Sequence, residues 1–254
     1  MIAVAGNLSI DIFPGRPPEI GGGPYHAARA LSRLRVPARL HVRCAPEDKA
    51  ALLPPLVRLG TPVRFVSGTA TASCGIRDDG DTRRMTLERI GDTWEPADVA
   101  DVSRSVGWVH VAPLARSDFP ARTLAALARN HRVSFDAQGL VRVPERGPLQ
   151  LDADYDEELL RHIWVLKVSE EEAPVLGDLR VLGVREVVLT RGSNGATVIV
   201  GGHAEEIPTH PLAADSTGAG DAFATAYVVA RNAGFAPVGA ARRANAVVAS
   251  LLTR

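Results

Sequence analysis

The most informative pattern in the sequence is A-A-D-S-T-G-A-G-D-A-F-A-T-A-Y, at residues 213–227. Its first polar residues are types that cap helices, and they precede the small residues Gly218, Ala219 and Gly220. Small residues at a helix start let backbone N–H groups face outward, where the positive end of the helix dipole favours an anion. The segment therefore predicts a phosphate-binding site at the start of a helix.

Asp221 lies in the first turn of that helix, beside the predicted phosphate site. A carboxylate at this place can accept the proton of an attacking hydroxyl, which is the role of the base in phosphoryl transfer. The alternative is structural, with Asp215 as the helix cap and Asp221 as a complement to the helix dipole. Seven residues with an acid at each end favour the chemical interpretation.

These residues need a scaffold, and strand and helix patterns alternate along the chain. Short apolar runs predict strands at residues 2–5, 40–44, 63–66, 106–112, 133–136, 163–168, 186–190 and 196–200. Helical spacing of apolar residues predicts helices at 24–34, 49–59, 121–130, 155–162, 170–176, 219–232 and 237–252. Repeated strand–helix units indicate an α/β fold with a mainly parallel sheet and helices on both faces. Such sheets bind ligands at the carboxyl ends of their strands.

Two segments interrupt this alternation. Residues 11–20 form a proline-rich loop, and residues 71–88 alternate apolar and polar residues around the turn D-D-G-D at 78–81. We interpret both as parts of a small β flap, or lid, over the main sheet. They are excursions from one domain that spans residues 1–254.

The composition excludes several classes of protein. Apolar residues make up 46% and charged residues 23% of the 254, as in ordinary globular proteins. Because 29 basic residues balance 29 acidic ones, nucleic acid is an unsupported partner. The short apolar runs and the lack of a secretory signal layout predict a cytoplasmic protein with no membrane partner. Cys44 and Cys74 lack metal or disulfide spacing, so we expect buried free thiols.

The residues D-S-T-G-A-G-D at 215–221 resemble the C-terminal signature of the ribokinase-like, or PfkB, carbohydrate kinases. The resemblance implies a three-layer sandwich with a lid, ATP as the phosphoryl donor and Mg²⁺ as the cofactor. It also implies that Asp221 is the catalytic base and that the amides of Gly218, Ala219 and Gly220 form the anion hole. Four further segments match the family in order, so the resemblance spans almost the whole chain.

Three segments resemble the family's acceptor side. V-A-G-N-L-S-I-D at 4–11 is similar to its first strand, G-G-G-P-Y-H-A-A at 21–28 to its diglycine signature, and F-D-A-Q-G-L-V-R at 135–142 to a segment of inositol kinases. His26 stands where the family usually has asparagine. The substrate-binding residues that the resemblance implies are Asp11, Gly21, Gly22, His26, Gln138 and Arg142.

Two segments resemble the donor side. K-V-S-E-E-E-A at 167–173 is similar to the N-x-x-E segment near magnesium, with Ser169 in place of the asparagine, and L-T-R-G-S-N-G-A at 189–196 is similar to the nucleotide-side strand and turn. The implied nucleotide-binding residues are Thr190, Gly192, Gly195 and Asn245. The implied metal-binding residues are Glu172 for magnesium, with Asp215 and Thr217 for a monovalent cation.

The expected function is transfer of the γ-phosphoryl group of ATP to a hydroxyl of a small sugar, polyol or cyclitol. A nucleoside kinase and a non-catalytic sugar-binding or regulatory protein on the same fold are the alternatives, while an oxidoreductase lacks its glycine fingerprint. The chain ends 33 residues after Asp221, where the family continues into a segment that closes the adenine pocket. We therefore expect little activation by potassium and, at most, an about tenfold preference for ATP over GTP. A homodimer through the lid strands is left open.

Overall fold

The structure is a computed structural model that describes residues 1–79, 82–209 and 217–253. Within these residues the main sheet has nine strands, in the order β14-β13-β12-β11-β9-β8-β1-β4-β5. Strands from β12 to β5 in this order are parallel, and β13 and β14 are antiparallel additions at one edge. The strand bounds are Ile2–Asn7 for β1, Ala38–Cys44 for β4, Val63–Ser67 for β5, Trp108–Val111 for β8, Arg132–Asp136 for β9, Val165–Ser169 for β11, Glu186–Thr190 for β12, Ala196–Val200 for β13 and His203–Ile207 for β14.

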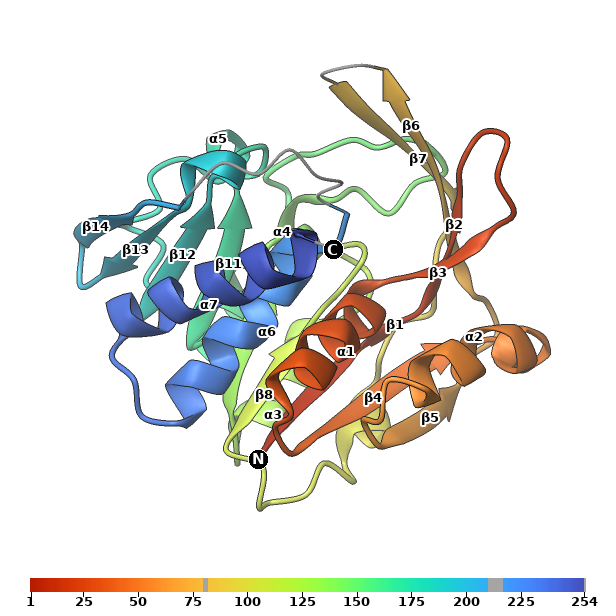
Figure 1. The fold of residues 1–254 in the computed structure, drawn as a ribbon, viewed down its shortest axis with the longest axis horizontal. Helices are drawn as coiled ribbons and strands as arrows, with labels where there is room; N and C mark the ends of the chain where they lie inside the picture. Colours follow the sequence, from red (N-terminus) through yellow and green to blue (C-terminus); the bar gives the residue numbers. More distant parts are fainter. Residues whose placement is uncertain (80–81, 210–216, 254) are drawn as a thin grey trace.

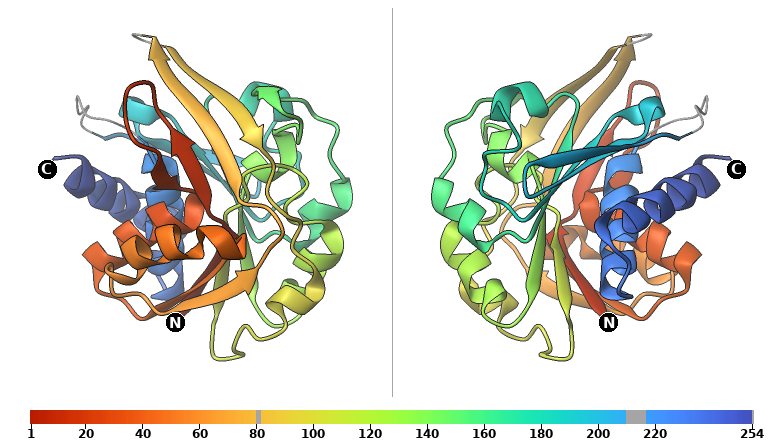
Figure 2. Two further views of the ribbon diagram at one scale, coloured as in Figure 1. Left: turned by 90° about the vertical axis from the view of Figure 1, so that its right-hand side faces the viewer. Right: turned by 90° about the vertical axis from the view of Figure 1, so that its left-hand side faces the viewer.

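Helices cover both faces of this sheet (Figures 1 and 2). One face carries α1 (Gly23–Leu34), α2 (Lys49–Val57), α6 (Ala219–Asn232) and α7 (Pro237–Leu252). The other carries α3 (Ala121–Ala128), α4 (Gln138–Val141), α5 (Ala173–Leu176) and the 3₁₀ helices η2 (Pro96–Val99) and η3 (Glu157–His162). Because both faces are covered, every residue of the central strand β1 is buried. The expected three-layer α/β sandwich is confirmed.

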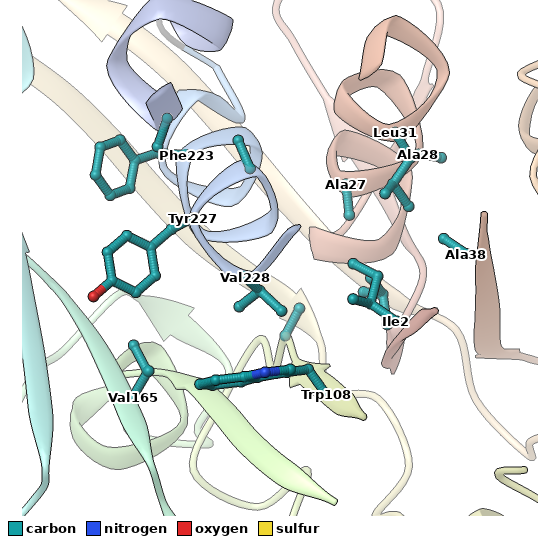
Figure 3. Close-up of a cluster of buried hydrophobic side chains, with 14 of the residues drawn as sticks. Ile2, Ala27, Ala28, Leu31, Ala38, Trp108, Val165, Phe223, Tyr227 and Val228 are labelled. Carbon is teal, nitrogen blue, oxygen red and sulfur yellow. The ribbon is translucent and has the colours of Figure 1, made fainter. Parts of the chain in front are cut away.

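The core on the α1 and α6 face joins the sheet to the helix that carries the predicted base (Figure 3). Phe223 and Tyr227 of α6 stack with ring centroids 6.4 Å apart. Trp108 of β8 and Ile2 of β1 lie beneath α6 and α1, and all of these side chains are buried. Burying large apolar side chains contributes roughly 1.5–3 kcal/mol each, so this packing holds the start of α6 in a fixed place over the sheet.

The lid is a second sheet of five strands within the described residues, in the order β10-β7-β6-β2-β3, beyond the carboxyl ends of the main strands (Figure 1). Its strands are Ser9–Ile12 (β2), Glu19–Gly21 (β3), Ala72–Asp79 (β6), Thr82–Arg89 (β7) and Gly147–Pro148 (β10). The predicted strand pair at 71–88 is confirmed. Residues 80 and 81 of its D-D-G-D turn lie outside the described residues. The loop predicted for 11–20 is wrong at both ends, because β2 pairs with β6 and β3 pairs with β2.

Other differences are local. The helix expected at 155–162 is the 3₁₀ helix η3, and the one expected at 170–176 shortens to α5. Pro174 near the start of α5 and Gly177 at its end, with φ of 73°, fix those limits. Strand β14 was missed because four of its five residues are exposed and leave no apolar run. Cys44 and Cys74 are buried free thiols, as expected, and burial raises their pKa values to about 11 and about 12.

Across the residues that the structure describes, no helix combines the length and the apolar character that crossing a membrane requires.

At the amino end of β12, one buried carboxylate links this strand to α6 and to the residue before β11. Glu186 accepts hydrogen bonds from Tyr227 at 2.8 Å, from Trp164 at 3.3 Å and from Arg231 at 2.6 and 3.0 Å. Replacing Glu186 by glutamine removes the charge opposite Arg231, so we expect a loss of about 2–3 kcal/mol in the free energy of unfolding. The expected loss is smaller than for breaking a fully buried ion pair, because Arg231 keeps some contact with water.

Urea denaturation measures this loss. Glu205→Gln is the matched control, because Glu205 pairs with Arg242 at 3.4 Å with both side chains exposed, and it should leave the midpoint unchanged. An unchanged midpoint for Glu186→Gln as well would show that the Glu186 cluster does not stabilise the fold.

Candidate active site

A cleft of about 1410 Å³ lies between the lid, the carboxyl edge of the main sheet and the start of α6. Most of the residues predicted for the site line it: Asp11, Gly22, His26, Gln138, Arg142, Glu172, Thr190, Gly192, Gly195, Thr217, Gly218, Ala219, Gly220, Asp221 and Asn245. Among the described residues, Gly21 is the predicted site residue that does not line the cleft. Asp215 lies outside the described residues. The structure therefore brings segments from the whole length of the chain into one place.

Helix α6 begins at the predicted anion site. Gly218 is its N-cap with φ of 73°, and the first helical hydrogen bond runs from the Ala222 amide to the Gly218 carbonyl at 2.9 Å. The amides of residues 218–221 precede that bond, so they are the ones that a helix leaves for other partners. A Cβ atom on Gly218 would collide with Nδ1 of His26, so the buried His26 ring packs directly against the N-cap of α6.

The Asp221 carboxyl is set among both signs of charge. Burial raises the pKa of Asp221, the nearby Lys167 and Arg142 oppose that rise, and Glu172 and Asp11 add to it, with a net rise above the usual carboxyl pKa. A base works best when its pKa approaches the operating pH, so the shift moves Asp221 in the direction that favours general-base catalysis.

Asp11 is one of the residues predicted for the acceptor side. Its Oδ1 accepts a hydrogen bond from the Ser9 hydroxyl at 2.7 Å. A Cβ atom on Gly21 would stand 2.1 Å from Asp11 Oδ2, so the missing side chain at Gly21 lets the carboxylate lie against strand β3. Gln138 lies at the start of α4, and its backbone N–H donates a hydrogen bond to Asp136 Oδ1 at 3.2 Å. The two sheets thus present their polar groups to the same cleft.

Most of the residues predicted for the donor side lie where β12 turns into β13. The Thr190 hydroxyl donates to the Val168 carbonyl at 3.2 Å, which joins the ends of β12 and β11. Gly195 has φ of 85°, and a Cβ atom there would stand 2.1 Å from the Ile207 carbonyl oxygen. Asn245 of α7 donates to the same oxygen at 3.3 Å. Gly195 and Asn245 therefore hold this turn against β14 and α7 at the rim of the cleft.

The residues present fit a magnesium ion that is bound mainly by its substrate. Glu172 is buried, and its Oε2 accepts the Ser169 amide at 2.8 Å, which fixes the carboxylate at the end of β11. In the described ranges, no three His, Cys, Asp or Glu side chains lie close enough to hold a metal by themselves. Mg²⁺ is commonly bound by one or two carboxylates together with phosphates and water, so a single carboxylate such as Glu172 is compatible with such a site.

Sequence reasoning assigned no role to Lys167. This side chain lines the cleft, is 4% exposed, and places its Nζ 3.2 Å from Oδ2 of Asp136, which is fully buried. The sequence does mark Lys167 as unusual, since Lys49 and Lys167 are the only lysines among 29 basic residues.

Comparisons with known proteins agree with this fold. A solved pyrophosphate-dependent kinase in the ribokinase family, in complex with a pyrophosphate analog and myo-inositol, has 28% sequence identity and a TM-score of 0.86. That comparison covers 99% of this chain and 95% of the other. A Burkholderia thailandensis nucleoside kinase in complex with inosine has 21% identity and a TM-score of 0.78, over 100% of this chain and 91% of the other.

A fructokinase from Vibrio cholerae, bound to fructose, ADP and calcium ion, has 20% identity and a TM-score of 0.75. The comparison covers 100% of this chain and 94% of the fructokinase. No curated protein matches the sequence. The sequence model described as the pfkB family carbohydrate kinase matches residues 76–254. The chain therefore belongs to the PfkB family of carbohydrate kinases and is a phosphotransferase with an alcohol group as acceptor.

Proposed function

We propose that this kinase transfers the terminal phosphoryl group of ATP to a hydroxyl of a small cyclitol, sugar or polyol, with Asp221 as the base. One observation carries the proposal. Asp221 stands in the first turn of α6, beside the leading amides of that helix, and shares a single cleft with Asp11 on the lid side. A base, an anion site and a hydroxyl-binding carboxylate are the parts that this reaction needs.

The chemistry follows from these positions. Asp11 binds hydroxyls of the acceptor, and Asp221 accepts the proton of the attacking hydroxyl. The acceptor oxygen forms a bond to phosphorus while the bond to the leaving group breaks, and the leaving group takes the electron pair. The amides at the start of α6 stabilise the charge on the transferring group. When bound, Mg²⁺ would be held at Glu172 and would neutralise charge on the donor phosphates.

We favour a cyclitol or ketose as acceptor. Polar side chains from β2, α4 and the segment after it converge on the cleft, which suits a ligand with several adjacent hydroxyls. A nucleoside comes second, because Phe13 and Phe223 are the only Phe, Tyr or Trp residues among the described residues that line the cleft, and a base needs aromatic faces on which to stack.

Pyrophosphate is a second candidate donor. The related kinase with 28% identity over nearly the whole chain is pyrophosphate-dependent, whereas the Vibrio cholerae fructokinase is bound to ADP. Both donors present a terminal phosphoryl group, so the α6 amides and Asp221 serve either one.

A donor-consumption assay tests the proposal. ATP and pyrophosphate are each combined with myo-inositol, fructose, ribose and adenosine, and initial rates are compared. Turnover with myo-inositol or fructose supports the proposed acceptor class. A clear preference for adenosine would make the protein a nucleoside kinase. If calorimetry detects sugar binding but no combination of donor and acceptor gives turnover, the protein is a non-catalytic binding protein.

Asp11→Asn should raise the acceptor KM by about 10- to 100-fold with a smaller change in kcat. The substitution keeps the shape but removes the charge that strengthens hydrogen bonds to hydroxyls, and each such bond is worth roughly 1.5–3 kcal/mol. Steady-state kinetics at saturating donor measure the effect. Glu19→Gln, on the neighbouring strand β3 at an exposed position, is the control. An unchanged KM for Asp11→Asn would remove Asp11 from the acceptor site.

A further inference from the structure

Lys167 is a buried cation that the proposed chemistry leaves without a task. It lies on β11, and burial would lower its pKa, but the carboxylates of Asp136, Glu172 and Asp221 outweigh that effect and raise it. Lys167 therefore keeps its proton at neutral pH. The ion pair with Asp136, at 3.2 Å, fixes the ammonium in one position at the wall of the cleft.

That position adjoins the start of α6. A Cβ atom on Gly220 would stand 3.1 Å from Nζ and 3.4 Å from Cε of Lys167. The absence of a side chain at Gly220 thus lets the ammonium lie against the same helical turn whose amides form the anion site. An anion bound at that turn would lie within reach of the ammonium group, and a hydrogen bond between an ammonium and a phosphate oxygen is stronger than one between neutral groups.

We propose that Lys167 is a further catalytic residue of the phosphoryl transfer, and that its ammonium contacts the transferring phosphoryl group at the start of α6. Asp136 acts as the positioning residue that aims the ammonium. In the transfer step Lys167 keeps all its protons and donates a hydrogen bond to a phosphoryl oxygen. The acceptor proton goes to Asp221, the new oxygen–phosphorus bond forms, and the leaving group departs with its electron pair. This inference rests on the proposed kinase function.

A purely structural ion pair is the competing explanation. The chain uses arginine at 27 of its 29 basic positions, so a lysine at the wall of the cleft is an exception. The other lysine, Lys49, is exposed, and its Nζ lies 4.7 Å from the Phe65 ring centre. The two lysines thus form a natural pair of test and control positions.

Carbon-13 labelling of the lysines gives a direct test, because the two residues should give two sets of resonances. Methylenediphosphonate and a non-hydrolysable ATP analogue are titrated in turn, with calorimetry to establish saturation. We expect the Lys167 resonance to shift with at least one bound probe and the Lys49 resonance to stay in place. An unchanged Lys167 resonance at saturation overturns the inference while leaving the kinase function intact. If neither probe binds, the proposed function fails and the inference fails with it.

Kinetics of variants supply the second test. Lys167→Met should lower kcat by about 10- to 100-fold, the loss of one charged hydrogen bond, while Lys49→Met keeps the wild-type rate. Because Lys167→Met leaves Asp136 buried without its partner, the double variant Lys167→Met with Asp136→Asn removes both charges and protects the fold. A folded double variant with wild-type kcat overturns the inference.

Discussion

Asp221→Asn is expected to lower kcat by about 10²–10⁴-fold while the acceptor binds with a Kd within tenfold of the wild-type value. The variant keeps the size and shape of the side chain and removes only its ability to take a proton, and base catalysis is typically worth that much. Steady-state turnover gives kcat, and calorimetric titration with the acceptor gives Kd. Asp178→Asn, at an exposed position after α5, is the matched control and should keep the full rate.

The pH dependence of kcat gives a second test of Asp221 as the base. The base must be ionised, so kcat should rise with pH through the Asp221 pKa, and burial places that pKa above the usual carboxyl value. The acid limb of the wild-type profile should therefore lie at a higher pH than it would for a base with the usual aspartate pKa. A wild-type rate for Asp221→Asn, or a profile without an acid limb, would assign the base to another group.

Chelating divalent cations is expected to reduce turnover by at least about 100-fold, with recovery on adding excess Mg²⁺. Uncompensated charge on the donor phosphates repels the incoming oxygen. A bound metal ion stabilises the charge of the transition state by several kcal/mol. Rates in excess EDTA, before and after adding magnesium, measure the effect. Glu172→Gln should raise the magnesium concentration needed for half-maximal rate. Full activity in excess chelator would exclude a required divalent cation.

The parts of the fold and site that could be predicted are those with a local signal. The residues at 219–232 and 237–252 form helices with the predicted limits, because small and apolar residues recur there at helical spacing. The segment at 215–221 is similarly local, since capping types, glycines and an acid specify one turn. From that segment alone the sequence indicates both an anion site and its neighbouring base.

What could not be predicted depends on tertiary contacts. Strands β2 and β3 exist because they pair with each other and with β6, and a proline-rich segment gives no sign of those partners. The contact of Gly21 with Asp11 depends on the pairing of β3 with β2, and the approach of Lys167 to Gly220 joins residues far apart in the sequence. Such approaches become visible only when the sheet is assembled.

Several expectations from the sequence stay predictions. Asp215 lies outside the described residues, and its role stays a prediction together with the weak potassium dependence, the cytoplasmic location and the single-domain organisation. The homodimer through the lid also stays a prediction, with β3 as the edge strand that such a dimer would pair.

Phosphorus-31 NMR of one reaction tests the central claim most directly. The protein, myo-inositol, magnesium and either ATP or pyrophosphate are followed over time, in parallel with Asp221→Asn. We predict a new phosphomonoester resonance that grows as the donor signal falls with the wild-type protein, and no such resonance over the same period with the variant. An equal product signal from both proteins, or donor loss without any phosphomonoester, would contradict phosphoryl transfer through Asp221.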